Sequence, residues 1–179
     1  YLNAVRLGRD GIAKWNAGAK AGESPPSRCD TCPHQAECHP IFGAVEGYGL
    51  YPFTSQALWN AALRVDHSMP ESLNPRILQN DLLVEVLDNF GPSIATGTFP
   101  ELRLLEKLGG IKALPAVAQA DLQSRNPQNF KRWAAFLELY DGSGTITNLD
   151  ERLRAAFDVP EIPGASAKTG VVHHPNFDR

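Results

Sequence analysis

All three cysteines of the chain, Cys29, Cys32 and Cys38, lie in one short segment together with two of the five histidines, His34 and His39. Two cysteines separated by two residues can bind one ion from a tight turn, and a third returns after a short excursion. Thiolate and imidazole ligands suit zinc or an iron–sulfur cluster, and they suit calcium or magnesium poorly. The spacing therefore predicts a hairpin that is held together by a metal centre.

A single ion in this hairpin would need a fourth ligand besides the three cysteines. His39 directly follows Cys38, and we favour it although two adjacent ligands strain the backbone between them. His34, inside the hairpin, is the next candidate, and the third is His67 or a residue from a part of the protein outside this sequence. A set of three cysteines and His39 closes a structural zinc site and leaves no open position for a catalytic water.

The same cysteine spacing also resembles the three-cysteine part of cluster-binding regulators, which add a fourth cysteine upstream. This chain has no fourth cysteine, so a cubane cluster would need a histidine or an iron without a protein ligand. We therefore favour structural zinc. An iron–sulfur redox sensor is the alternative.

Length and composition limit the class of protein. The 179 residues allow one domain or two small ones, and 42% hydrophobic with 21% charged residues is ordinary for a globular chain. No apolar run approaches the ~20 residues that span a bilayer, so no membrane association is expected. Clustered cysteines with none left to pair favour a reducing compartment, which predicts a cytoplasmic protein. The net charge of −3 gives no global basic field for nucleic acid.

The apolar spacing predicts a mostly α-helical bundle with the cysteine-rich hairpin as an insertion. Helices are expected over residues 1–20, 56–64, 74–90, 100–108, 114–122, 126–140 and 149–157. Thr54 or Ser55 is a plausible N-cap for the helix over 56–64. The helix over 74–90 would stop at Gly91-Pro92, with one apolar face made of Leu78, Leu82, Val86 and Phe90 and widened by Leu83 and Leu87. Residues 1–70 would form a helix, the zinc hairpin and an aromatic loop at 48–53; residues 71–160 would form a helical lid or bundle; and 161–179 would be a flexible tail. Strand-like patterns at 145–147 and 171–172 are too short to build a sheet.

Two further sets of residues could bind a ligand. Arg76 follows Asn74-Pro75 in the first turn of a predicted helix, where it is either an ordinary surface arginine or a residue that contacts a nucleotide phosphate. Lys131 and Arg132 flank Trp133 and could contact DNA, although the solvated side of a helix is the more common role. The sequence has no phosphate-binding loop, dinucleotide fingerprint or paired nucleophile, so we assign no catalytic residue.

Three segments carry a family resemblance: CxxCPxxxxCHxxFG at 29–43, GLYPF at 49–53 and NPRxL at 74–78. Together they resemble the region after the ATP core in large P-loop ATPases of bacterial anti-phage islands. These are AAA+-like or STAND-like proteins of the BREX and DNA-phosphorothioation-dependent restriction kind. The resemblance covers roughly residues 1–90.

This resemblance implies that the chain is a helical lid and adaptor region with a structural zinc, and that Arg76 senses the phosphate end of ATP. The phosphate loop would then lie in a preceding part of a longer protein, in agreement with the absence of an initiator Met. The implied partners are that ATPase core, other defence proteins and DNA. The rival interpretation is a stand-alone zinc module that binds nucleic acid or a protein through Lys131, Arg132 and residues 48–53.

Overall fold

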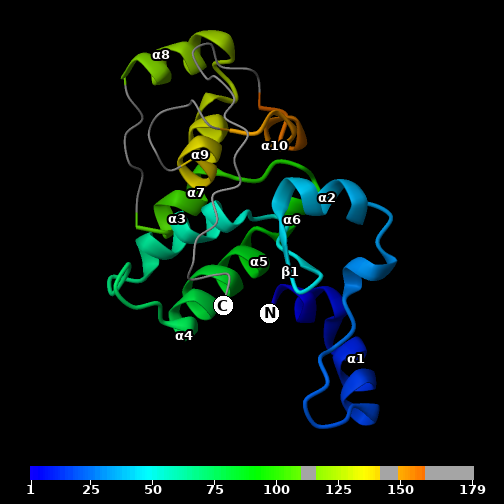
Figure 1. Ribbon diagram of the computed structural model, residues 1–179. Helices are drawn as coiled ribbons and strands as arrows, with labels where there is room; N and C mark the ends of the chain where they lie inside the picture. The colour runs from blue at the N-terminus through cyan, green and yellow to red at the C-terminus, as the bar shows by residue number, and fades with distance from the viewer. Residues whose placement is uncertain (110–115, 142–148, 160–179) are drawn as a thin grey trace. The chain divides into compact units, whose positions relative to one another are not determined.

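The computed structural model describes residues 1–109, 116–141 and 149–159, and this part of the chain is mostly helical, as predicted (Figure 1). The chain separates into two compact units, Tyr1–Pro52 and Phe53–Arg179. The sequence prediction placed a boundary after residue 70 instead. None of the described helices is both long and apolar enough to cross a membrane.

The first unit is built from short elements around a small β-hairpin. Helix α1 (Leu2–Gly18) is followed by a 3₁₀ turn, η1 (Arg28–Thr31), and helix α2 (Gln35–Phe42). Strands β1 (Ala44–Val45) and β2 (Tyr48–Gly49) pair antiparallel. Helix α1 is interrupted at Gly8, whose φ of 71° and ψ of 173° suit a residue without a Cβ. The predicted first helix is therefore present but broken into two segments.

Few side chains in the first unit are buried. The buried residues between Tyr1 and Pro52 are Asn3, Cys29, Phe42, Gly49 and Pro52. Hydrogen bonds of polar side chains hold this unit together in place of an apolar core. The Asn3 side chain donates to Pro26 O at 3.0 Å and accepts from Arg28 N at 2.9 Å. A unit of this size with so little buried apolar surface usually needs a disulfide or a metal.

The second unit is a helical bundle. Its elements are α3 (Ser55–Val65), α4 (Pro75–Ile77), the π-helical segment η2 (Leu78–Val84), α5 (Glu85–Asn89), α6 (Gly91–Ala95), α7 (Leu102–Lys107), α8 (Ala116–Arg125), α9 (Phe130–Tyr140) and α10 (Glu151–Ala156). The hydroxyl of Thr54 accepts a hydrogen bond from Ala57 N and caps α3, as the sequence predicts. The sequence predicts a helix end at Gly91-Pro92, but a further helix, α6, begins at Gly91 with Pro92 in its first turn.

Helix α9 is the centre of the bundle and packs against α3, α7 and α8 (Figure 1). Every residue from Ala135 to Tyr140 is buried, so this helix has no wide solvent face. The rings of Phe136 and Tyr140 both contact Phe157, at centroid distances of 5.2 and 5.0 Å. A buried ion pair between Arg64 and Glu138 joins α3 to α9.

Helices α4 and α5 are joined by η2 into one helical stretch, as predicted for residues 74–90. The Asn74 side chain accepts from Arg76 N at 3.1 Å, and Pro75 occupies the first helical position. Leu82, Leu83, Val86 and Phe90 of the predicted apolar face are buried, whereas Leu78 and Leu87 are half-buried. The π-helical turn in its middle has no signature in the sequence that we recognised.

The second Asn-Pro pair behaves differently. We expected the helix over 126–140 to begin at Asn126-Pro127, but α9 begins at Phe130. The Asn126 side chain accepts from the backbone N–H groups of Gln128 and Asn129, and this local turn delays the helix. The strand patterns at 145–147 and 171–172 and the tail 161–179 lie outside the described residues.

Asp66 organises the loop that leads to Asn74. Its carboxylate is 2% exposed and accepts from the hydroxyl and N–H of Ser68 and from Asn74 N, the last at 2.8 Å. The Ser68 hydroxyl first, and then the Asn74 N–H, hold the pKa of Asp66 below its ordinary value. These bonds therefore stabilise the fold above the unfolded-state pKa of about 3.9, and the contribution is lost as pH falls through the lower folded-state pKa.

We expect Asp66→Asn to weaken this loop at pH 7 and to flatten the acid dependence of stability. Urea unfolding at a series of pH values between neutrality and about pH 3, below the reference pKa of aspartate, measures both effects. Asp81→Asn, which changes an exposed carboxylate on η2, is the matched control. An Asp66→Asn chain that loses stability on acidification as steeply as the wild type would contradict the expectation.

Candidate metal centre

The three cysteines lie around one hollow of about 300 Å³ in the first unit. The 3₁₀ turn η1 carries Cys29, Cys32 follows its last residue, and α2 carries Cys38. The hollow is lined by Arg6, Arg28, Cys29, Thr31, Cys32, Pro33, Cys38, Gly49 and Tyr51. Arg6 of α1 and Gly49 of β2, which lie outside the cysteine motif in the sequence, also border this hollow.

Cys29 is the most enclosed of the three cysteines, at 9% exposed, whereas Cys32 is exposed. Its Sγ accepts a hydrogen bond from Gly49 N at 3.3 Å and lies 3.7 Å from Arg6 Nη1. Backbone and guanidinium N–H donors of this kind stabilise a thiolate. The surroundings of Cys29 therefore suit a sulfur that carries negative charge.

Arg6 fixes one wall of the hollow, and the sequence analysis did not identify it. Its Nη1 donates to Gly49 O at 2.8 Å and its Nη2 donates to Tyr51 O at 2.6 Å. These bonds tie the first turns of α1 to β2 and the residues after it. An isolated arginine in a helix carries no motif, so its role emerges only when the chain folds.

His39 has a buried nitrogen without a partner. Its Nε2 accepts or donates no hydrogen bond among the described residues. An ideal Cβ built on Gly49 would lie 3.0 Å from this Nε2 and 3.1 Å from Cys29 Sγ, so both ligand atoms border the same glycine. The other two histidines considered, His34 and His67, are exposed. The geometry thus suits His39 as a ligand better than it suits the two alternatives.

The sulfurs influence one another electrostatically. Burial raises the pKa of Cys38, the Arg6 cation lowers it, and the charges of Cys29 and Cys32 raise it further. Burial and the charge of Cys38 likewise raise the pKa of Tyr51. A cation bound beside Cys38 would favour its thiolate form.

The hollow keeps the potential ligands apart. Within residues 1–109, 116–141 and 149–159, no group of three or more His, Cys, Asp or Glu side chains could hold a metal ion as it stands. A zinc ion holds thiolates at about 2.3 Å, so its sulfurs crowd around one point. In this structure the cysteines line a shared hollow without forming such a group.

The residues proposed to bind other ligands lie in the second unit. Arg76 is exposed on α4, and Lys131 is exposed on α9. The Arg132 guanidinium donates through Nε and Nη2 to the carbonyls of Gly97, Thr98 and Phe99. Burial lowers the pKa of Arg132 below its ordinary value. These bonds give Arg132 a role within the second unit, and its part in a nucleic-acid surface stays a prediction.

Most aromatic side chains of the loop at 48–53 already contact other residues of the protein. The Tyr48 hydroxyl donates to Pro25 O at 2.7 Å, and Phe53 is fully buried. The ring of Tyr51 packs edge-on against Phe42 at 4.9 Å.

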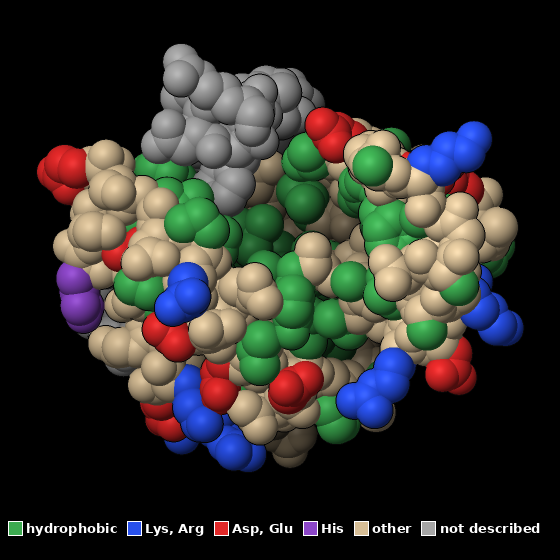
Figure 2. Space-filling model, turned by 90° about the horizontal axis from the view of Figure 1, so that it is seen from below, with side chains coloured by type: hydrophobic (Ala, Val, Ile, Leu, Met, Phe, Trp, Pro, Cys, Tyr) green, Lys and Arg blue, Asp and Glu red, His purple; other side chains and the backbone are tan. Residues whose placement is uncertain are grey.

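On the face shown in Figure 2, Lys and Arg side chains lie among Asp and Glu side chains. The candidate binding residues are Arg76, Lys131, Arg132 and the aromatic residues of 48–53. Among them, only Arg76, Lys131 and Tyr51 have substantial exposed surface.

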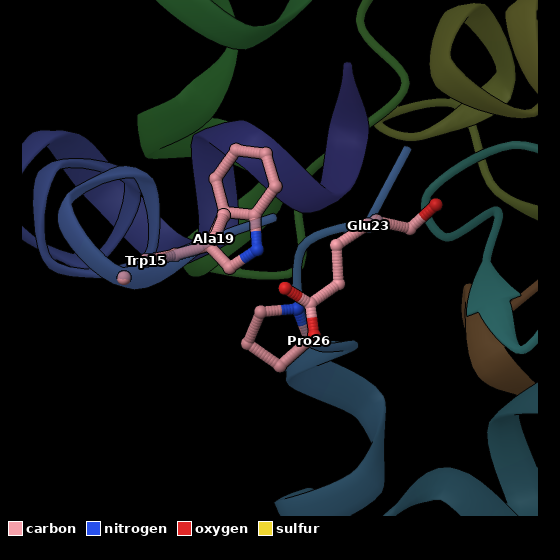
Figure 3. Close-up of a pocket in the computed structure, with 6 residues that line it drawn as sticks. Trp15, Ala19, Glu23 and Pro26 are labelled. Atoms are coloured by element: carbon pink, nitrogen blue, oxygen red, sulfur yellow. The ribbon is translucent and has the colours of Figure 1, made fainter. Parts of the chain in front are cut away.

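A second hollow, of about 320 Å³, lies beside the end of α1 (Figure 3). The indole nitrogen of Trp15 faces the side on which Glu23 and Pro26 lie, and it has no hydrogen-bond partner among the described residues. The Glu23 carboxylate accepts from Lys20 N at 2.8 Å. This hollow has one donor and one exposed carboxylate, which is too little to specify a ligand.

Replacing Gly49 by alanine should damage the centre, because the new methyl group would press on His39 Nε2 and Cys29 Sγ. Overpacking of this kind costs about 1–3 kcal/mol. Hydrogen exchange of the amides in α2 and β2 measures the loss. Gly18→Ala is the matched control, because a Cβ at residue 18 would meet nothing within 4 Å. Equal protection in both variants would contradict the close approach at Gly49.

No protein-family model matches the chain, and neither a curated protein nor a solved structure matches it.

Proposed function

We propose that the first unit is a metal-binding module whose centre is held by Cys29, Cys32 and Cys38, and that it stabilises an accessory region of a larger ATPase. The observation that supports the metal centre most directly is the convergence of all three cysteines on one hollow. The unpartnered Nε2 of His39, beside Cys29 at Gly49, adds a fourth potential ligand.

The chemical work of this module is structural. Its 52 residues bury little apolar surface, so folding cannot draw on a large hydrophobic core. Binding of a structural metal contributes about 10–16 kcal/mol in zinc-finger peptides, which replaces the missing core energy. The metal thereby holds α1, η1, α2 and the hairpin in one arrangement.

Zinc is the first candidate for the metal. Cys29, Cys32, Cys38 and His39 form the three-sulfur, one-nitrogen set of closed structural zinc sites. Zinc binding would draw these four side chains together and close the hollow. An iron–sulfur cluster is the second candidate, because three thiolates that line one hollow can also ligate a cluster.

The test is the metal content of the full chain, purified without oxygen. One metal centre per chain in the wild type, and none in Cys38→Ser, is the expected result. His34→Ala is the matched control and should keep the metal, since His34 is exposed and lies outside the hollow. Wild-type protein that binds neither zinc nor iron would contradict the proposal.

The second unit would act as the lid of the ATPase, with DNA-linked defence as its setting. The support is the family resemblance together with the exposure of Arg76 at the start of a well-capped helix. In this proposal α4 and η2 close over the nucleotide, and Arg76 contacts its phosphates. The chain itself supplies no hydrolytic residue.

Arg76→Ala in the longer ATPase should weaken ATP binding by roughly 10- to 100-fold, because a hydrogen bond to a charged group contributes about 1.5–3 kcal/mol. Equilibrium nucleotide binding and ATP turnover are the measurements. Lys131→Ala removes another exposed cation and should change neither. Unchanged binding in Arg76→Ala would exclude the sensor role and leave the metal module unaffected.

A further inference from the structure

We propose that Cys29 and Cys32 are also an oxidation site, at which a peroxide joins the two sulfurs in a disulfide and thereby releases the metal. This inference rests on the proposed function, in which both cysteines bind one metal ion together with Cys38 and His39. It goes further by making metal binding depend on the oxidation state of the chain.

The turn η1 holds Cys29 and Cys32 in a geometry that a disulfide can adopt. Cys32 N donates to Cys29 O at 3.0 Å and closes the 3₁₀ turn. Such a turn rises about 2.0 Å per residue and places side chains i and i+3 above one another, so their Cα atoms are about 6 Å apart. Disulfides join Cα atoms that lie about 4.4–6.8 Å apart. The two cysteines can therefore be linked without a change in the course of the backbone.

Residues on both sides of the turn fix this geometry. The Ser27 hydroxyl accepts a hydrogen bond from Cys29 N at 3.2 Å, and Ser27 O accepts one from Asp30 N at 3.2 Å. At the other end, Pro33 favours an extended backbone at the residue before it, and Cys32 has a φ of −85° and a ψ of 123°. The backbone thus positions the pair before any bond forms between the sulfurs.

Cys32 and Cys29 differ in the way that stepwise oxidation requires. Cys32 is exposed, so a peroxide reaches its sulfur from solvent. Cys29 is 9% exposed, and its Sγ lies 3.3 Å from Gly49 N and 3.7 Å from Arg6 Nη1. Oxidation-sensing cysteines are typically accessible and lie beside a second cysteine that resolves the oxidised form. We therefore assign the first oxidation to Cys32 and its resolution to Cys29.

Cys38 is a less suitable partner for Cys32. It is half-buried and lies on a separate element, α2, where its backbone N donates to His34 O at 2.8 Å. The hydrogen bond that closes η1 joins Cys32 to Cys29. Oxidation is therefore expected to join Cys29 to Cys32 and to leave Cys38 as a free thiol.

The reaction consumes one peroxide and two thiolates. The Cys32 thiolate attacks an oxygen of hydrogen peroxide, the O–O bond breaks, hydroxide leaves, and Cys32 becomes a sulfenic acid. The Cys29 thiolate then attacks the Cys32 sulfur, forms the S–S bond and displaces a second hydroxide. Two protons from solvent convert both hydroxides to water. The two electrons that the sulfurs lose reduce the peroxide.

Disulfide formation removes two of the four proposed ligands. A closed zinc site needs four ligands, and Cys38 with His39 alone does not complete one. Because the first unit buries little apolar surface, loss of the metal should also cost its ordered structure. The second unit, Phe53–Arg179, contains no cysteine and should keep its fold. The first unit thus converts exposure to an oxidant into a loss of its own structure.

The experiment treats the zinc-loaded full chain with hydrogen peroxide, in the presence of a dye that reports released zinc. Remaining thiols are then alkylated, and the chain is cleaved before Asp30 and after Glu37, which places the three cysteines on three different peptides. Mass spectrometry identifies which two peptides are joined. Amide hydrogen exchange of α2 and α9 is measured on the same samples.

The expected main product is a Cys29–Cys32 disulfide, with one zinc ion released for each disulfide formed. Protection should be lost in α2 and kept in α9, and a dithiol reductant with added zinc should restore both zinc and protection. Oxidation in concentrated urea, which removes the turn, is the matched control and should give a mixture of cysteine pairings. The same pairings in buffer and in urea would overturn the role of the turn.

The remaining outcomes separate this inference from the proposed function. Zinc that stays bound under peroxide, or a main product in which Cys38 is joined, would overturn the oxidation site and leave the metal module standing. A chain that binds neither zinc nor iron before oxidation would overturn both. Each measurement uses the wild-type chain, so poor folding of cysteine variants does not affect the result.

Discussion

Cys29→Ser should abolish the ordered structure of the first unit while the second unit keeps its own. Cys29 is the buried cysteine. Its sulfur accepts a hydrogen bond from Gly49 N and lies close to Nη1 of Arg6. Without the metal centre, the unit would depend on a core in which Phe42 is the main large buried side chain. The loss of about 10–16 kcal/mol of metal binding is comparable to the whole stability of a typical domain, about 5–15 kcal/mol.

Amide hydrogen exchange of the full chain resolves the two units in one measurement. In Cys29→Ser we expect α2, β1 and β2 to exchange like an unfolded chain, while α9 remains protected. His34→Ala, which removes an exposed imidazole from the same segment, should leave the pattern unchanged. A metal-free Cys29→Ser protein that retains wild-type protection in α2 would show that the metal is not structural.

Arg64→Met should destabilise the second unit by about 3–5 kcal/mol. The side chains of Arg64 and Glu138 are 8% and 6% exposed, and their ion pair joins α3 to α9. Removing the cation leaves a carboxylate enclosed in the bundle without its main counter-charge, and desolvation then costs more than the lost contact. This pair should therefore be far more sensitive to substitution than an ion pair on the surface.

Denaturant unfolding with a probe in α9 measures the change. The double variant Arg64→Met/Glu138→Leu should recover most of the loss, because it removes both charges and fills the space with apolar atoms. Arg125→Met is the matched control: its pair with Asp121 is about one-third exposed and should contribute about 0–1 kcal/mol. Equal losses in Arg64→Met and Arg125→Met would contradict the role of burial.

Local signals in the sequence predicted much of the second unit. Thr54 caps α3, and Asn74-Pro75 starts the stretch in which Leu82, Val86 and Phe90 are buried. These features depend on residues within one or two turns, so they can be recognised from spacing alone. Asn126-Pro127 shows the limit of such signals, since the same pair instead formed a turn before Phe130.

The candidate centre could be predicted only in part. The spacing of the cysteines identified the sulfur atoms, and adjacency suggested His39. The cysteine spacing did not predict helix α2, which includes Pro40. It also did not predict the β-hairpin that brings Gly49 close to Cys29. Arg6 and Gly49 are 43 positions apart, so no local pattern links them. Contacts of this kind arise only from the tertiary fold.

The hydrogen bonds of α1 have a consequence for biosynthesis. Asn3 bonds with Pro26 and Arg28, and Arg6 bonds with Gly49 and Tyr51, so the structure around the cysteines closes within Tyr1–Pro52. Translation proceeds from the N-terminal side, and domains generally fold as they emerge. In the proposed function, the metal centre could therefore be loaded while the ribosome is still adding the helices of the second unit. Metal supply during synthesis, rather than after release, would then set the yield of the folded first unit.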